Sequence, residues 1–151
     1  MKTLFETSGT LSPAGSRSHI CFTVFLPESV DFMAVNFSYT PKILSDPARA
    51  ELLRQEGEAR YFNDPRFPNN GIRDTGVLTN LLTLSFDDAR GFRGACHRHP
   101  SEQHLFLGKD SASPGLLPGI IPAGLFRVTM SVHAVLTETC EYKISIFQGD
   151  S

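Results

Sequence analysis

The stretch that decides the fold is Phe126-Arg127-Val128-Thr129-Met130-Ser131-Val132-His133. Apolar and polar side chains alternate along it, so every second residue falls on the same side of an extended chain. A strand with one apolar and one polar face is typical of an antiparallel sheet that packs on a second layer. The stretch therefore predicts a strand whose apolar side is buried and whose outer side carries Arg127, Thr129, Ser131 and His133.

The same period of two recurs along the chain. Each run is short, rich in β-branched and aromatic residues, and bounded by Gly, Pro, Asn or Asp. The runs occupy residues 19–26, 32–39, 81–86, 126–133 and 140–147, with weaker runs at 4–11 and 103–107. About seven to nine short strands predict an all-β fold, an antiparallel β-sandwich that is jelly-roll-like.

Residues 41–76 depart from this pattern. Asp46 is a good helix N-cap, Pro47 suits the first helical position, and residues 48–56 are strong helix formers before Gly57. Residues 63–76 carry prolines and glycines without periodicity. We therefore expect an insertion made of one short helix and an irregular surface loop, inside a single domain of residues 1–151.

Composition limits the function classes. The chain has 151 residues, which is enough for one domain, and a formal net charge of −2. This charge gives no electrostatic reason to expect binding to nucleic acid or to an anionic membrane. No apolar run is long enough to span a membrane, and no signal peptide is visible. Three unclustered cysteines predict a reduced, cytoplasmic protein in which Cys21 and Cys140, inside predicted strands, are buried.

Residues 91–104 (GFRGACHRHPSEQH) contain a candidate metal site. On a strand, His97 and His99 would point to the same side, as two metal ligands must. Together with Gly91 and Glu102 they resemble the first motif of the cupins, although Glu102 comes one residue early; His104 is a further candidate ligand. One alternative is therefore a small cupin-like metal-binding protein or metalloenzyme.

Two features oppose the metal site. In the second cupin motif, which residues 122–124 approximate, Arg127 and Ser131 occupy the places of the ligand histidine and of an asparagine. Pro100 indicates that His99 begins a loop, because proline disrupts strand pairing. The other interpretation of the segment is a solvated, basic loop, with no cofactor.

The remaining candidates are a turn and the outer strip. Asp87 and Asp88 precede a glycine and predict a turn, which Arg93 could hold by pairing with either carboxylate; Arg93 is also a candidate ligand or interface residue. The outer strip of residues 127, 129, 131 and 133 could bind a sugar or peptide, which makes a weak carbohydrate-binding module a second alternative. The sequence contains no recognisable nucleophile elbow, phosphate loop or dinucleotide fingerprint, so an enzyme is not expected.

Two longer stretches resemble a known domain. Residues 80–94 (NLLTLSFDDARGFRG) and 112–128 (ASPGLLPGIIPAGLFRV) are similar, in the same order, to the N-terminal β-sandwich that precedes the metal-dependent PHP phosphoesterase domain in carbaryl-hydrolase-type (CehA/McbA) proteins. Tyr39-Thr40-Pro41 matches a third motif there. Ala89, Ser113, Leu116 and Phe126 depart from the usual proline, threonine, tyrosine and tryptophan.

This resemblance implies a sandwich fold and an association with hydrolases. The His and Asp metal ligands of the phosphoesterase domain are missing from these 151 residues, so the resemblance transfers no activity. The leading hypothesis is a non-catalytic module that binds another protein or domain, such as a PHP-type hydrolase. The prolines and glycines of residues 114–124 are expected to serve tight turns between the two sheets.

Overall fold

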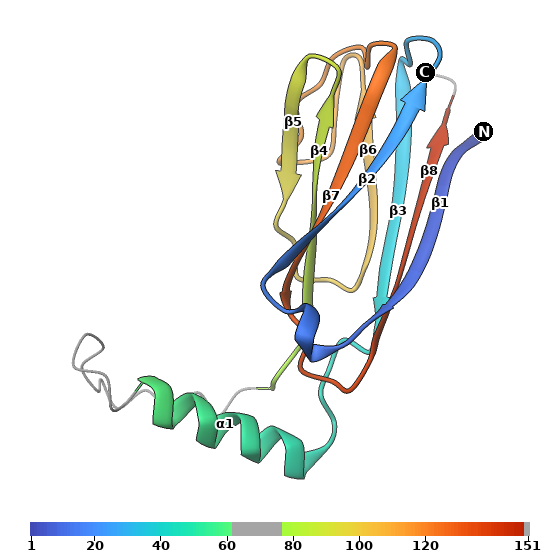
Figure 1. Ribbon diagram of the computed structural model, residues 1–151. Helices are drawn as coiled ribbons and strands as arrows, with labels where there is room; N and C mark the ends of the chain where they lie inside the picture. The colour runs from blue at the N-terminus through green and yellow to red at the C-terminus, as the bar shows by residue number, and fades with distance from the viewer. Residues whose placement is uncertain (62–76, 150–151) are drawn as a thin grey trace.

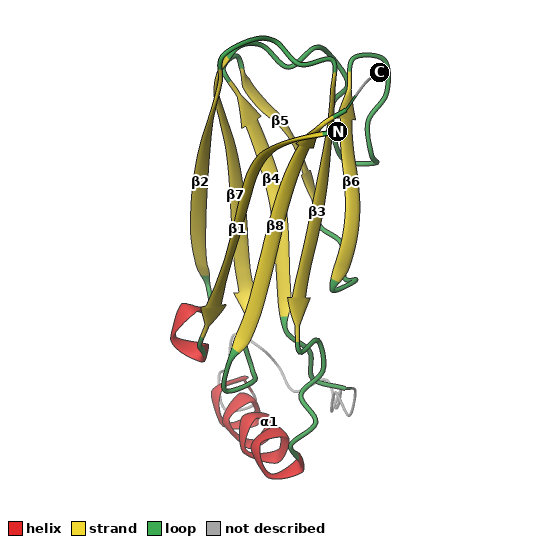
Figure 2. Ribbon diagram, turned by 90° about the vertical axis from the view of Figure 1, so that its right-hand side faces the viewer, coloured by secondary structure: helices red, strands yellow, loops and turns green. Residues whose placement is uncertain are grey.

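The computed structural model describes residues 1–61 and 77–149, and these contain eight strands, one α-helix and one short 3₁₀-helix. The strands are β1 (Lys2–Leu11), β2 (Ser18–Leu26), β3 (Phe32–Thr40), β4 (Leu81–Asp88), β5 (Gly91–Cys96), β6 (Glu102–Gly108), β7 (Gly124–Ala134) and β8 (Cys140–Gln148). They form two antiparallel sheets: sheet A in the order β1-β8-β3-β6 and sheet B in the order β2-β7-β4-β5. The sheets lie face to face, with the helix beyond one end (Figures 1 and 2).

The strand pairing is that of a jelly roll. The first strand pairs with the last, β2 with β7, β3 with β6, and β4 with β5. The chain is therefore equivalent to one long hairpin that is rolled into two layers. Pairing of β3 with β8 joins the strands of sheet A, and pairing of β4 with β7 joins those of sheet B. The prediction of an all-β sandwich of this type is confirmed.

The core lies between the sheets, where the apolar positions of the alternating runs meet. Phe126 from β7 and Phe86 from β4 are fully buried, and their ring centroids are 6.0 Å apart. Sheet A supplies Phe37 and Ile144 to the same cluster. Because side chains on one face recur every second residue, the period of two indicated which half of each strand is buried.

Residues 42–44 and 78–80, on either side of the insertion, pair with each other where the insertion leaves the sandwich. Ile43 and Thr79 form a β-bridge, and the Leu44 and Asn80 amides each donate to a carbonyl across it. The helix α1 (Pro47–Tyr61) begins after Asp46, whose Oδ1 accepts the Ala48 amide at 3.0 Å. It continues past Gly57, so the predicted end at that glycine is wrong. The loop predicted for residues 63–76 lies outside the described residues.

Strand β5 was absent from the predicted set. It is short, and Gly91 and Gly94 interrupt any alternation. Its free edge is covered by the β6–β7 connection, where Gly94 bridges Leu116 and the Ala95 amide donates to the Gly115 carbonyl.

The only long described helix, α1, is not long and apolar enough to cross a membrane.

Candidate functional site

The predicted polar strip lies on the outer face of sheet B, at the centre of that sheet. Because β7 pairs with both β2 and β4, Arg127, Thr129 and Ser131 each have a polar or small neighbour on either side, whereas His133 lies beyond these paired rows. The cross-strand rows, read from β2 through β7 to β4, are Thr23–Arg127–Asp87, Cys21–Thr129–Ser85 and His19–Ser131–Thr83. The predicted outward orientation of Arg127, Thr129, Ser131 and His133 therefore corresponds to the observed register.

Most side chains of this strip already form polar contacts with side chains of the neighbouring strands β2 and β4. His19 Nδ1 lies 2.9 Å from Ser131 Oγ, and His133 Nε2 lies 2.8 Å from the Thr83 hydroxyl. Cys21, expected to be buried, is exposed on this face and approaches the Thr129 hydroxyl at 3.5 Å. Its position one residue away from the apolar half of β2 explains the difference.

At one end of the strip, His97 and His19 lie close enough to His133 to change its pKa. The rings of His133 and His97 lie with centroids 6.3 Å apart, almost edge to face. Partial burial lowers the pKa of His133 below its ordinary value, and the positive charges that His97 and His19 can carry lower it further. This corner therefore favours neutral imidazole at His133.

The candidate metal ligands are divided between the two sheets. Strand β5 ends at Cys96, so His97 and His99 lie in a loop, as Pro100 indicated, and His97 faces His133 on sheet B. His104 lies on the outer face of sheet A, where it contacts Asn36 Oδ1 at 2.8 Å and Glu102 at 3.4 Å. Among the described residues, no group of three or more His, Cys, Asp and Glu side chains is placed to hold a metal ion.

Arg93 does not join the outer strip, because its guanidinium is buried. It pairs with Asp88 at 2.6 Å, and the exposed fractions of the two side chains are 9% and 2%. Arg93 Nη2 donates to the carbonyls of Leu117 and Gly119 at 2.8 and 2.9 Å. Asp88 also accepts the Arg90 amide at 2.8 Å, which forms the predicted turn. Of the two roles considered for Arg93, this geometry is that of the structural one.

Sequence reasoning missed an apolar surface at the β4–β5 end of sheet B. Five large apolar side chains are exposed there, by 46 to 69% of their area: Phe25, Phe92, Leu117, Ile120 and Leu125. Two adjoining hollows of about 360 and 270 Å³ lie among them and share Asp88, Arg90 and Gly91. We call this region the β4–β5 surface.

A signal for part of it was present in the sequence. Phe25 and Leu125 occupy the polar half of their alternating strands, and they are direct partners across β2 and β7. An apolar residue at an outward position of a strand is a candidate for contact with another molecule. Phe92, Leu117 and Ile120 follow no period, so only the fold brings them to this surface.

Comparisons with known proteins add little. No protein-family model matches the chain, and no curated protein sequence matches it. A crystal structure of a protein from Sulfurospirillum deleyianum is similar over 97% of this chain and 99% of that chain, with 9% sequence identity and a TM-score of 0.33. Similarity at this level carries no argument about function.

Proposed function

We propose that this chain is a non-catalytic module that binds another protein domain, a PHP-type metal-dependent hydrolase domain, through the β4–β5 surface. The observation that carries the proposal is which parts of the sequence form that surface. Except for Thr23, every residue that lines its two hollows belongs to residues 80–94 or 112–128. These are the two stretches that resemble the sandwich found beside such hydrolase domains.

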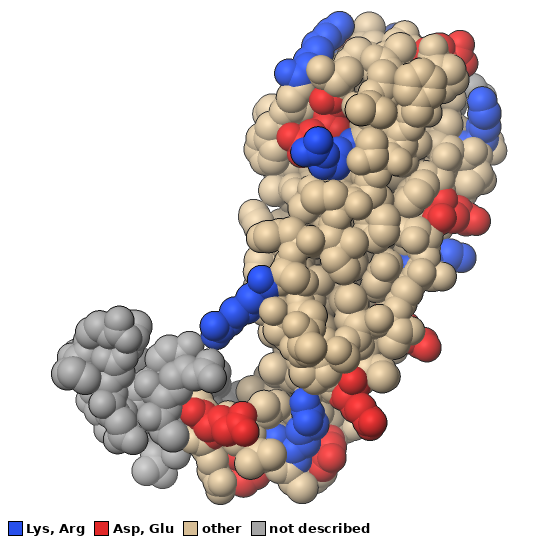
Figure 3. Space-filling view, in the orientation of Figure 1, with Lys and Arg blue, Asp and Glu red and all other residues tan. Residues whose placement is uncertain are grey.

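The composition of the surface supports a protein partner. Exposed aromatic side chains and arginine are enriched in protein interfaces, and apolar side chains around them help to exclude water. Here Phe92 and Leu125 are 61 and 59% exposed, and Arg127 lies next to Leu125 in the larger hollow. In the view of Figure 3, acidic and basic side chains lie close together over the upper end of β4 and β5, so a partner there would have to complement charges as well as cover apolar side chains.

The surface is also held rigid before binding. Arg93 connects the β4–β5 turn, through Asp88, to the carbonyls of the segment that carries Leu117 and Ile120. A pre-formed surface loses less conformational entropy when a partner docks. The buried ion pair therefore supports binding by fixing the shape of the hollows that it helps to line.

Calorimetric titration tests this proposal directly. The full chain is titrated with a separately purified PHP domain from a carbaryl-hydrolase-type protein, and we expect saturable binding. A Phe92→Ser/Leu125→Ser variant should bind at least about tenfold more weakly, because two exposed apolar contacts are lost. The matched control is Ile43→Ser/Leu52→Ser, since both side chains are 53% exposed but belong to the insertion. Absence of binding by the parent, or an equal loss in the control, would overturn the proposal.

Metal analysis tests the non-catalytic part. The purified chain is expected to contain no stoichiometric zinc, iron, nickel or manganese, because His97 faces sheet B whereas His104 and Glu102 lie together on the outer face of sheet A. A His97→Ala/His99→Ala variant serves as the comparison. Stoichiometric metal in the parent that this variant loses would favour the cupin-like alternative instead.

A further inference from the structure

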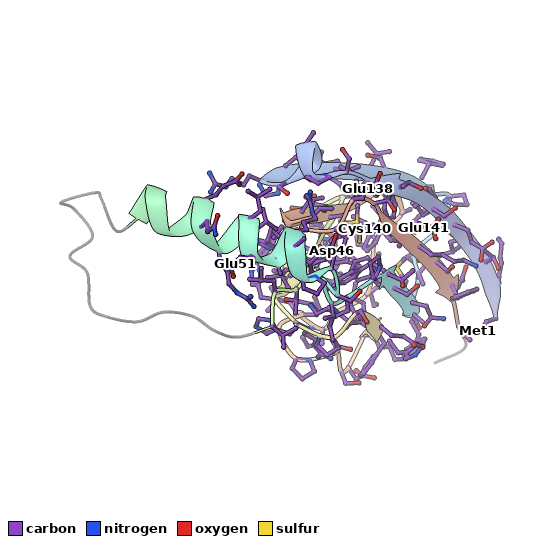
Figure 4. All side chains as sticks on the ribbon, turned by 90° about the horizontal axis from the view of Figure 1, so that it is seen from below. Met1, Asp46, Glu51, Glu138, Cys140 and Glu141 are labelled. Atoms are coloured by element: carbon purple, nitrogen blue, oxygen red, sulfur yellow. The ribbon has the colours of Figure 1, made fainter. Side chains whose placement is uncertain are left out.

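A second hollow lies on the opposite sheet. A groove of about 740 Å³ crosses the outer face of sheet A at the end that carries α1, over β1, β8 and β3. Figure 4 looks along the strands from this end and labels Glu141 in β8, close to the β7–β8 connection that carries Glu138. We call it the sheet A groove. Its volume is within the range of about 300–1,000 Å³ typical of small-molecule sites.

The floor of the groove consists of two neighbouring cross-strand rows. The first row, read from β1 through β8 and β3 to β6, is Ser8–Lys143–Ser38–Glu102. The second row is Thr10–Glu141–Thr40. Every outward side chain in both rows carries a hydroxyl, an ammonium or a carboxylate, so the floor presents hydrogen-bond donors and acceptors throughout.

These groups are free to bind, unlike those on sheet B. Within residues 1–61 and 77–149, the Ser8, Thr10, Ser38 and Thr40 hydroxyls make no side-chain hydrogen bond to another described residue. On sheet B, the corresponding histidines and hydroxyls pair with one another across the strands. The sheet A groove therefore has unused hydrogen-bonding capacity at positions that the sheet fixes.

One wall of the groove is held in place. Lys42 Nζ donates to the Tyr39 hydroxyl and to the Asn80 carbonyl, both at 2.8 Å. Two of the three donors of this ammonium are therefore used within the protein, and they fix the Lys42 side chain at the edge of the groove. Tyr39 itself is only 3% exposed, which leaves its ring unable to stack on a ligand.

The charges of the groove determine the ligand class. Two lysines, Lys42 and Lys143, are balanced by two glutamates, Glu102 and Glu141. A polyanion would meet the carboxylates and a polycation the ammonium groups, whereas a neutral ligand with many hydroxyls can use all of them. We propose that the sheet A groove binds a neutral oligosaccharide by hydrogen bonds alone.

Amide chemical-shift mapping with the full chain tests the proposal. The neutral probes are maltotetraose, cellotetraose and xylotetraose, and the charged probes are a heparin tetrasaccharide and spermine. We expect at least one neutral probe to produce saturable shifts at residues 8–10, 38–40 and 141–143. Neutral probes that leave these residues unshifted, or shifts there with a charged probe alone, would overturn the proposal.

A pair of matched double variants completes the test. Ser38→Ala/Lys143→Ala removes two central groups of the floor and should weaken binding by about tenfold or more. Ser29→Ala/Lys109→Ala removes the same residue types outside the groove and should leave binding unchanged. Thermal unfolding of both variants checks that they are folded. An equal loss of affinity in the two variants would contradict the assignment.

Discussion

At the scale of single residues, Arg93 is the side chain on which the β4–β5 surface most depends. Its guanidinium is buried with the Asp88 carboxylate at 2.6 Å and also holds the carbonyls of Leu117 and Gly119. Burial of two charges is costly, and here five hydrogen-bonded contacts offset that cost. Removal of one partner would leave the other charge buried alone.

Arg93→Met should therefore lower the free energy of unfolding by about 3–5 kcal/mol, because the Asp88 carboxylate loses its partner. Urea denaturation followed by circular dichroism measures the change. Arg127→Met is the control on the same sheet: its side chain is exposed, and we expect a change within about 0.5 kcal/mol. Equal destabilisation by the two substitutions would show that Arg93 is not structural.

The group formed by His133, His97 and His19 predicts that the stability of the fold depends on pH. The pKa of His133 is lowered by burial and by the neighbouring His97 and His19, so the unfolded chain takes up this proton before the folded chain does. Stability should then fall as the pH drops below about 6.5, the ordinary histidine value.

The contribution of His97 can be isolated by NMR titration of the His133 ring protons. Replacement by His97→Ala removes a like charge and should raise the pKa of His133 toward its ordinary value. His104→Ala, on the opposite sheet, should leave it unchanged. A pKa of His133 that does not respond to His97→Ala would rule out this electrostatic coupling.

At the scale of elements, β5 depends on close approach of two backbones. Gly94 has φ +119°, and a Cβ added there would lie 2.2 Å from the Gly115 carbonyl oxygen. The β6–β7 connection covers the edge of β5 at this contact, so only glycine is tolerated.

Two glycine substitutions should have opposite effects. Gly94→Ala should destabilise the fold by more than about 2 kcal/mol, because the left-handed backbone and the clash with Gly115 both oppose it. Gly57→Ala lies inside α1 with nothing within 4 Å and should increase helix content, since alanine favours a helix by about 1 kcal/mol over glycine. Thermal melts and far-ultraviolet circular dichroism measure both effects. Destabilisation by both would contradict this account.

The elements also show what the sequence could reveal. Strands such as residues 126–133 were predictable, because the period of two requires no knowledge of the partner strand. β5 was not, since its glycines serve contacts with a distant segment. The outward strip was predictable for the same reason as the strands. The sheet A groove was not, and the β4–β5 surface was predictable only at Phe25 and Leu125, because each combines residues from segments far apart in sequence.

At the scale of the whole molecule, the jelly-roll pairing joins the two ends of the chain. Ser145 donates to the Glu6 carboxylate across the β1–β8 pair, although the two residues are 139 positions apart. Closing so long a loop costs entropy before any contact compensates for it.

We therefore expect refolding from urea to take milliseconds to seconds, the range of β-proteins dominated by distant contacts. Stopped-flow tyrosine fluorescence can follow it, because Tyr39 is buried and Tyr142 packs against the core. Completion within microseconds would be incompatible with this topology.

The same pairing has a consequence for biosynthesis. Sheet A cannot close until β8 has emerged from the ribosome, and 139 positions separate Glu6 from its partner Ser145. At about 5–20 residues per second, synthesis of that length takes roughly 7–30 s. Throughout this interval the backbone of β1 has no hydrogen-bonding partner strand, so a nascent chain stalled before β8 should be a client for chaperones.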